Sequence, residues 1–201
     1  MEETRKGMLL VVSGASGTGK GTLVSRLLKE DPSFVFSVSA TTREPREGEM
    51  DNVHYHFLTE AQFDELLARD AFLEHATVHD HRYGTLKEEV FGRMELGQNV
   101  LLDIDTQGAF NVMAAAPDCV SVFILPPSYA ELRRRLEGRN TESPEVIERR
   151  WQNAHQEIPL MGRYQYIIVN DDFETAYAEL RAITLAEKQR STRYTPVVPE
   201  A

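Results

Sequence analysis

Short apolar runs alternate with amphipathic stretches along most of the chain. Buried strands are predicted where the apolar runs lack polar alternation, at residues 8–13, 99–105, 119–125 and 166–169. Apolar residues at helical spacing and capping signals predict helices at residues 20–30, 106–116, 128–138 and 171–190. Such an alternation is typical of an α/β protein whose parallel central sheet has helices on both faces.

Two segments depart from this alternation of strands and helices. Residues 37–60 combine polar alternation with turns, and Thr59 begins a short helix that is expected to end near Arg69, so this segment predicts an inserted lobe with a small sheet of its own. Residues 139–163 are polar and rich in arginine, with a helix start at Ser143, and we expect them to form a mobile flap. We expect the tail from residue 194 onward to be loose.

A glycine-rich stretch, Gly14-Ala-Ser-Gly-Thr-Gly-Lys-Gly-Thr22, lies between the first predicted strand and the first predicted helix. Its Gly14-x4-Gly19-Lys20 pattern in that position predicts a phosphate-binding loop, because glycines turn backbone N–H groups and a helix N-terminus toward phosphate oxygens. A glycine turn without a ligand is the alternative, and the strand–loop–helix context disfavours it. Gly21 stands where many such loops carry a hydroxyl for magnesium. The Lys-Gly-Thr sequence resembles the loop of nucleoside monophosphate kinases, in which magnesium is held mainly by nucleotide phosphates and waters.

The composition narrows the possible partners. The chain of 201 residues has a formal net charge of −10, which argues against binding to nucleic acid or to an anionic membrane surface. No apolar run is long enough for a membrane span. The single cysteine, Cys119, suits the reducing cytoplasm and is expected to be a small core residue. An acidic protein that binds phosphates must gather positive charge locally.

Two arginines lie on either side of Pro45 and would provide such a local positive charge. Arg43 and Arg46 are suited to bidentate contacts with a phosphate, and the hydroxyls of Tyr55 and Tyr83 are candidates for the same anion. A charged surface loop remains the alternative when the arginines are considered alone. Asp103, at the end of a predicted strand, is a candidate to hold a metal-bound water.

The sequence as a whole resembles the guanylate kinase family over roughly residues 7–190. The segments that carry the resemblance are 37–46 (SVSATTREPR), 71–75 (AFLEH), 83–85 (YGT), 102–108 (LDIDTQG), 123–128 (FILPPS), 135–139 (RLEGR) and 168–172 (IVNDD). The family transfers the γ-phosphate of ATP to GMP with magnesium. The resemblance therefore implies that Mg²⁺, ATP and GMP are the partners, with dGMP left open as a second acceptor.

The resemblance also implies roles for individual residues. The catalytic residues would be Lys20, Arg43, Arg139 and Arg150. The ATP site would comprise Gly14, Ala15, Ser16, Gly17, Thr18, Gly19, Lys20, Gly21, Thr22, Arg135 and Asn170. The GMP site would comprise Ser39, Arg43, Arg46, Tyr55, Glu74, Tyr83, Thr85, Asp103 and Asp105. Glu74 would accept hydrogen bonds from guanine N1–H and the 2-amino group, and adenine offers no such pair of donors. No side chain is expected to bind the metal directly.

The fold implied is the three-layer fold of phosphate-loop NTPases, with an inserted mixed-sheet lobe that binds GMP and a small helical lid. The expected divisions are residues 1–36 (core with the phosphate loop), 37–88 (lobe), 89–136 (core), 137–157 (lid) and 158–201 (core with the C-terminal helix and tail).

Some positions depart from the family's usual pattern. Asn140 stands where a glycine often follows Arg139, and Asn52 lies in a loop that usually has a glycine, although asparagine also tolerates positive φ. Residues 79–81 (His-Asp-His) suggest a metal site, but an exposed loop is the favoured interpretation. Two other functions were weighed: a kinase for another nucleoside monophosphate, and a non-catalytic guanylate-kinase-like module that binds peptides. The retained lysine and arginines disfavour the second.

Overall fold

Five parallel strands form the central sheet in the order β10-β9-β2-β8-β3. The structure is a computed structural model that describes residues 4–78, 80–138 and 143–198. The strands are β2 (Leu9–Gly14), β3 (Phe34–Phe36), β8 (Asn99–Asp103), β9 (Val120–Leu125) and β10 (Tyr166–Val169). The predicted parallel sheet is confirmed, and β3 is an edge strand that the apolar pattern did not reveal.

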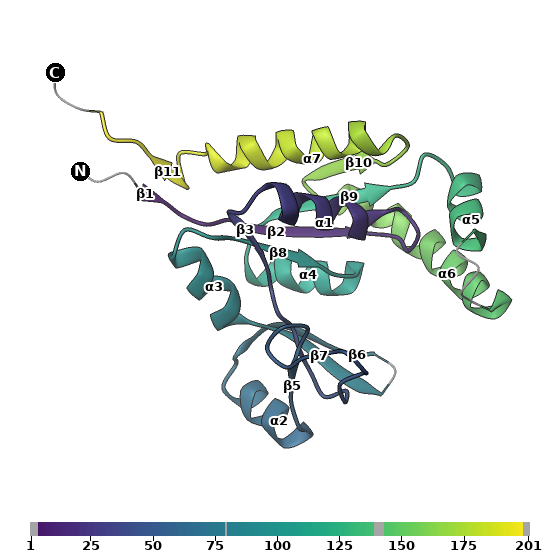
Figure 1. Cartoon of the computed structure of the whole chain (residues 1–201), viewed down its shortest axis with the longest axis horizontal. Helices are drawn as coiled ribbons and strands as arrows, with labels where there is room; N and C mark the ends of the chain where they lie inside the picture. The colour runs from purple at the N-terminus through teal and green to yellow at the C-terminus, as the bar shows by residue number, and fades with distance from the viewer. Residues whose placement is uncertain (1–3, 79, 139–142, 199–201) are drawn as a thin grey trace.

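Helices cover both faces of this sheet (Figure 1). On one face lie α1 (Lys20–Glu30) and α7 (Phe173–Lys188), and on the other lie α3 (Lys87–Glu95) and α4 (Thr106–Ala115). Side chains along β2 alternate between the two cores: Leu10 packs in the cluster with α1 and α7, and Val11 packs in the cluster with α3 and α4. Both are fully buried, which explains why these strands show no polar alternation.

The inserted lobe has its own mixed sheet of four strands, in the order β5-β4-β7-β6. The strands are β4 (Ala40–Thr41), β5 (His56–Phe57), β6 (Phe72–Val78) and β7 (His81–Leu86). Helix α2 (Glu60–Ala68) begins at a capping box between Thr59 and Gln62, as predicted, and its Phe63 stacks on Phe72 of the sheet at 4.3 Å. The lobe lies below the core in Figure 1.

Three helical segments form a small unit beside the carboxyl end of β2 (Figure 1). They are α5 (Tyr129–Glu137), α6 (Pro144–Glu157) and the 3₁₀ helix η1 (Ile158–Arg163). Leu132 and Leu136 of α5 pack with Ala154 of α6 and with Ala15 of the phosphate loop. The position of the phosphate loop is therefore coupled to the position of α6.

Several sequence expectations need correction. The predicted strand 99–105 ends at Asp103, because the Asp105 side chain instead accepts a hydrogen bond from the backbone N–H of Gly108 and caps α4. The predicted tail is not loose throughout: β11 (Tyr194–Thr195) pairs with β1 (Thr4–Arg5), and the Arg5 guanidinium lies 4.0 Å from the Tyr194 ring. Helix α3 was not predicted. None of the helices in the described ranges is long and apolar enough to cross a membrane.

Candidate active site

The phosphate loop, here Gly14–Thr22, connects the carboxyl end of β2 to the start of α1. Gly19 caps the helix with a φ of 85°, a conformation that favours glycine. A Cβ atom on Gly19 would lie 2.3 Å from Asn170 Nδ2, which donates a hydrogen bond to the Thr18 carbonyl at 2.7 Å. Asn170 thus fixes the loop from outside and leaves no room for a side chain.

A cavity of about 500 Å³ lies over this loop. All nine loop residues line it, together with Asp103, Ile104, Asp105 and Glu157. Lys20 Nζ lies 2.5 Å from Asp103 Oδ1 and donates a hydrogen bond to the Ile104 carbonyl at 3.2 Å. The loop, the helix N-terminus and Lys20 together form a cradle for polyphosphate.

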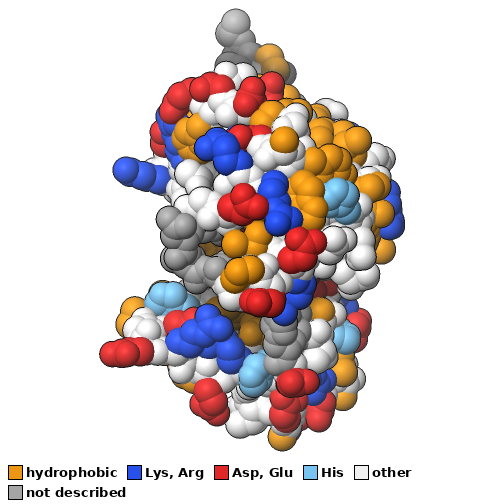
Figure 2. Space-filling view, turned by 90° about the vertical axis from the view of Figure 1, so that its right-hand side faces the viewer, with side chains coloured by type: hydrophobic (Ala, Val, Ile, Leu, Met, Phe, Trp, Pro, Cys, Tyr) orange, Lys and Arg blue, Asp and Glu red, His pale blue; other side chains and the backbone are white. Residues whose placement is uncertain are grey.

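A second cavity of about 320 Å³ lies between the core and the lobe. Ser39, Tyr55, Glu74 and Tyr83 line it from the lobe, and Asp103, Ile104 and Asp105 line it from the core. The last three residues also line the cavity over the phosphate loop. The two cavities therefore share a wall at the carboxyl end of β8, and Figure 2 shows the narrowing that separates core from lobe.

Glu74 is a partly buried carboxylate that lines this second cavity from the lobe. The Thr85 hydroxyl donates a hydrogen bond to Glu74 Oε1 at 2.8 Å, and Thr85 itself is fully buried. Burial raises the pKa of Glu74, and the charge of Asp105 adds to that rise. A carboxylate held in this way is suited to accept hydrogen bonds from a ligand that carries paired N–H donors.

Arg43 lies at the edge of the lobe with its side chain already held. Its guanidinium forms an ion pair with Glu49 at 2.9 Å and donates to the Glu44 carbonyl at 2.7 Å. The Arg46 backbone N–H also donates to Glu49, at 2.7 Å, whereas the Arg46 residue is exposed. Sequence reasoning missed Glu49, which organises this loop. Asn52 has a φ of 61°, so the expected positive φ at this position is confirmed.

A third cavity, also of about 320 Å³, adjoins the outer side of the phosphate loop. Arg135 and Asn170 line it, as do Gly17, Gly19 and Phe173. Arg135 donates to the Asn170 carbonyl at 2.9 Å and to Glu131 at 2.7 Å. The structure thus brings these two predicted residues together beside a ring of Phe173.

The helical unit contributes Arg150, which donates a hydrogen bond to Ser16 Oγ at 3.2 Å. Arg139 and Asn140 lie outside the described residues, as does His79. Within the described ranges, no group of three or more His, Cys, Asp or Glu side chains is arranged to hold a metal ion.

Glu157, which sequence reasoning also missed, is the last residue of α6 and lines the phosphate cavity. Only the tertiary structure reveals that proximity.

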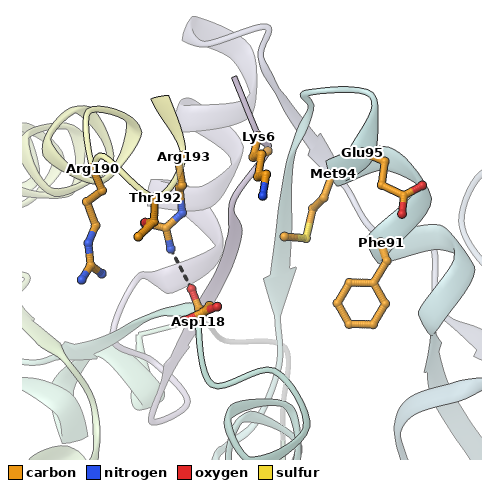
Figure 3. Close-up of a pocket in the computed structure, with 9 residues that line it drawn as sticks. Lys6, Phe91, Met94, Glu95, Asp118, Arg190, Thr192 and Arg193 are labelled. Carbon is orange, nitrogen blue, oxygen red and sulfur yellow. Dashed lines mark hydrogen bonds between the residues drawn. The ribbon is translucent and has the colours of Figure 1, made fainter. Parts of the chain in front are cut away.

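A larger cavity, of about 620 Å³, lies elsewhere (Figure 3). Phe91 and Met94 of α3 form one side, and Lys6 and Arg193 form the other, with Arg193 donating to the Asp118 carbonyl at 2.7 Å. These residues lie at the amino ends of the sheet strands, next to β2 and β9. Open parallel sheets bind their ligands at the carboxyl ends, where the phosphate loop lies, so the larger cavity is not the candidate active site.

A parallel α/β core, a phosphate loop and an adjoining cavity with a shared carboxylate wall define a nucleotide kinase of the phosphate-loop class. The sequence profile of the family described as guanylate kinase matches residues 6–187. The guanylate kinase of Caldanaerobacter subterraneus subsp. tengcongensis is 46% identical over 96% of this chain and 94% of its own length. That of Clostridioides difficile is 44% identical over 98% of this chain and 96% of its own.

A solved structure agrees with these sequence matches. The crystal structure of guanylate kinase from Anaplasma phagocytophilum superposes with a TM-score of 0.74 at 33% identity, covering 96% of this chain and 92% of that one. The chain therefore belongs to the guanylate kinase family, the enzymes that transfer a phosphoryl group from ATP to GMP.

Proposed function

We propose that the chain performs the guanylate kinase reaction with ATP at the phosphate loop, GMP in the lobe cavity and Mg²⁺ bound with ATP. One observation carries this proposal: Asp103, Ile104 and Asp105 line both cavities. A donor phosphate over the loop and an acceptor phosphate in the lobe would therefore meet at one wall. Family membership supplies the reaction, and the shared wall supplies the geometry.

On the donor side, backbone N–H groups of residues 14–22 would bind the β- and γ-phosphates, with Lys20 adding a positive charge. Arg135 and Asn170 line the adjoining cavity, which suits the adenine ring. Thr22 is exposed and lines both the phosphate cavity and the adjoining cavity of Arg135 and Asn170. Its hydroxyl would bind a phosphate oxygen. Gly21 lines the first cavity without contributing a side chain.

On the acceptor side, Glu74 would receive the guanine N1–H and 2-amino donors, with Ser39 and Thr85 completing the base contacts. Arg43, Arg46, Tyr55 and Tyr83 would hold the GMP phosphate. Support comes from the Tyr55 and Tyr83 rings, whose centroids are 6.0 Å apart in the cavity, and from the Arg43 guanidinium, 5.4 Å from the Tyr55 ring. Asp105 would lie near the nucleoside.

The residues around the phosphate cavity fit a bound magnesium ion through its waters. Mg²⁺ retains several waters and prefers oxygen ligands, and the Asp103 carboxylate lines the cavity where such waters would lie. When bound, the ion neutralises charge on the transferring phosphoryl group.

Catalysis would rest on positioning and charge stabilisation. The GMP phosphate is already anionic at neutral pH, so no strong general base is required. Lys20, Arg43, Arg139 and Arg150 would surround the transferring group with positive charge. Closure of the lobe (37–88) and the lid (137–157) over both nucleotides would exclude water, which would otherwise hydrolyse ATP. The reducing cytoplasm is the compartment that the lone Cys119 suits.

The test is ADP release by the purified chain with ATP and Mg²⁺ and with GMP, dGMP, AMP, CMP, UMP or dTMP in separate reactions. We expect release with GMP and not with AMP or the pyrimidine nucleotides. Release with AMP instead of GMP would overturn the role of Glu74. Absence of release with every acceptor, from a folded chain that binds GMP, would favour the peptide-binding module.

A further inference from the structure

Three carboxylates line the phosphate cavity, and two of them have a hydrogen-bond or ion-pair partner within the protein. Asp103 forms an ion pair with Lys20, and Asp105 accepts the Gly108 N–H at 2.7 Å. The side chain of the third, Glu157, forms no hydrogen bond or ion pair with another described residue, although it is only partly exposed; Lys20 and Asp105 are the charged groups that act on it. An unpaired carboxylate in a cavity built for polyphosphate needs an explanation, because like charges repel.

Glu157 lies close enough to Asp105 and Tyr164 for its charge to act on Tyr164 and for the charge of Asp105 to act on Glu157. Tyr164 follows shortly after Glu157 in the chain, beyond η1, and its hydroxyl is buried without a hydrogen-bond partner, as is the hydroxyl of Ser13 at the end of β2. Burial raises the pKa of Tyr164, and the charges of Asp105 and Glu157 add to that rise. Buried polar groups without protein partners are commonly satisfied by ordered water.

We propose that Glu157 makes the phosphate cavity select ATP complexed with a divalent cation over metal-free ATP. The inference rests on the assignment of ATP to the phosphate loop. Metal-free ATP brings its full negative charge next to Glu157 and is repelled. In the complex, the cation offsets that charge, and the waters that it carries would offer donors to the Glu157 carboxylate.

The position of Glu157 connects this selection to the lid. Glu157 is the last residue of α6, and Arg150 of the same helix reaches Ser16 in the loop. A nucleotide that repels Glu157 therefore pushes against the helix that carries Arg150. A cation bound with the nucleotide removes that repulsion, so Glu157 no longer opposes the position of α6 in which Arg150 reaches Ser16.

The test measures ATP affinity by isothermal titration calorimetry without GMP, so that no acceptor is present. Each protein is titrated with ATP in excess Mg²⁺ and with ATP in a chelator at the same ionic strength. The wild-type chain is expected to prefer the metal complex. In Glu157→Gln, metal-free ATP should bind more tightly and the metal complex less tightly, so that the ratio of the two affinities falls by about tenfold.

Glu145→Gln is the matched control, since it removes one negative charge from the exposed first turn of the same helix. It should keep the wild-type ratio. Glu157→Ala provides a second neutral variant in case the glutamine disturbs packing, and it should shift the ratio in the same direction.

An unchanged ratio in both Glu157 variants would overturn the proposal. A parallel loss of both affinities would also overturn it, because it would assign Glu157 a structural role only. If the wild-type chain bound ATP in neither buffer, the ATP assignment itself would fail, and the acceptor assay would show that separately.

Discussion

Lys20 Nζ and Asp103 Oδ1 lie 2.5 Å apart across the carboxyl ends of β2 and β8. This ion pair joins the phosphate loop to the wall that both nucleotide cavities share. Lys20 also donates to the Ile104 carbonyl on that wall, so its ammonium group lies where the two cavities adjoin. The relationship makes Lys20 the first residue to test.

Lys20→Ala is expected to lower the rate of ADP release by about 100-fold to 1,000-fold, because it removes a preorganised positive charge at the transferring group. The fold should remain intact, since Asp103 is partly exposed and water can solvate it. Steady-state ADP release and circular dichroism would check both expectations. Lys29→Ala, in the last turn of α1, is the control and should retain full activity. A rate near that of the wild type would refute the role of Lys20.

Glu74→Gln is expected to weaken preference for GMP over AMP by about 100-fold or more, measured as the ratio of kcat/KM values. The amide replaces one acceptor with a donor, which leaves a guanine N–H group unpaired. Glu65→Gln, on the exposed side of the lobe helix α2, should keep the wild-type ratio. An unaltered preference in Glu74→Gln would remove Glu74 from the guanine site.

Glu74→Gln is also expected to raise the free energy of unfolding, by an amount that depends on pH. Burial raises the pKa of Glu74 in the folded protein, so the folded state binds this proton more tightly than the unfolded state does. The charged form therefore lowers the free energy of unfolding increasingly as pH rises from about 4.3 through the raised pKa. Glu74→Gln should be more stable than the wild type in urea at pH 7, with the difference shrinking at pH 5. A constant difference would contradict this explanation.

Glu187 stabilises the end of the core opposite the phosphate loop. Only 5% exposed, it accepts a hydrogen bond from the Tyr166 hydroxyl and forms an ion pair with Arg193, each at 2.6 Å. Glu187→Gln is expected to lower the free energy of unfolding by about 3 kcal/mol, because Arg193 loses its buried counter-charge. Urea denaturation checks this, with exposed Glu179→Gln of α7 as the control. A loss below about 1 kcal/mol would show that the pair is not needed.

Two neighbouring glycines of the phosphate loop are expected to behave differently. At Gly21 an added Cβ meets no atom within 4 Å, so Gly21→Ala should stabilise α1 by about 0.5 kcal/mol and leave ADP release unchanged. At Gly19 the same change places Cβ 2.3 Å from Asn170 Nδ2 at a φ of 85°, and should destabilise by at least about 1–2 kcal/mol. Thermal unfolding and ADP release compare them. Lost turnover in Gly21→Ala would mean that the loop needs this glycine when nucleotide is bound.

Elements with a regular apolar pattern were predicted well. The strands near residues 8–13 and 166–169 and the helix at 20–30 appear close to their expected bounds as β2, β10 and α1. The exceptions have local causes. β3 is only three residues long and lies at the sheet edge, and β11 exists because β1 pairs with it from the other end of the chain. Such pairings leave little periodic signal.

The residues of the candidate site likewise fall into those that the local sequence could identify and those that it could not. Gly14–Thr22 could be assigned to phosphate from its own sequence, because a strand, a glycine loop and a helix N-terminus form a local unit. Glu49 and Glu157 could not be assigned, because their importance depends on neighbours brought by folding: the Arg43 guanidinium for one and the phosphate cavity for the other. From sequence alone, a single charged residue in a polar segment is interpreted as a solvated surface residue.

By itself, then, the sequence determined the α/β class, the phosphate loop and the resemblance to guanylate kinases, since each depends on residues close together or on a long ordered set of motifs. Only the tertiary structure decided that the end of β8 forms one wall for two cavities, that Lys20 pairs with Asp103 there, and that Glu157 faces the phosphate loop unpaired. These relationships arise because parallel strands bring their carboxyl ends to one edge, and the chain order does not state which side chains meet there.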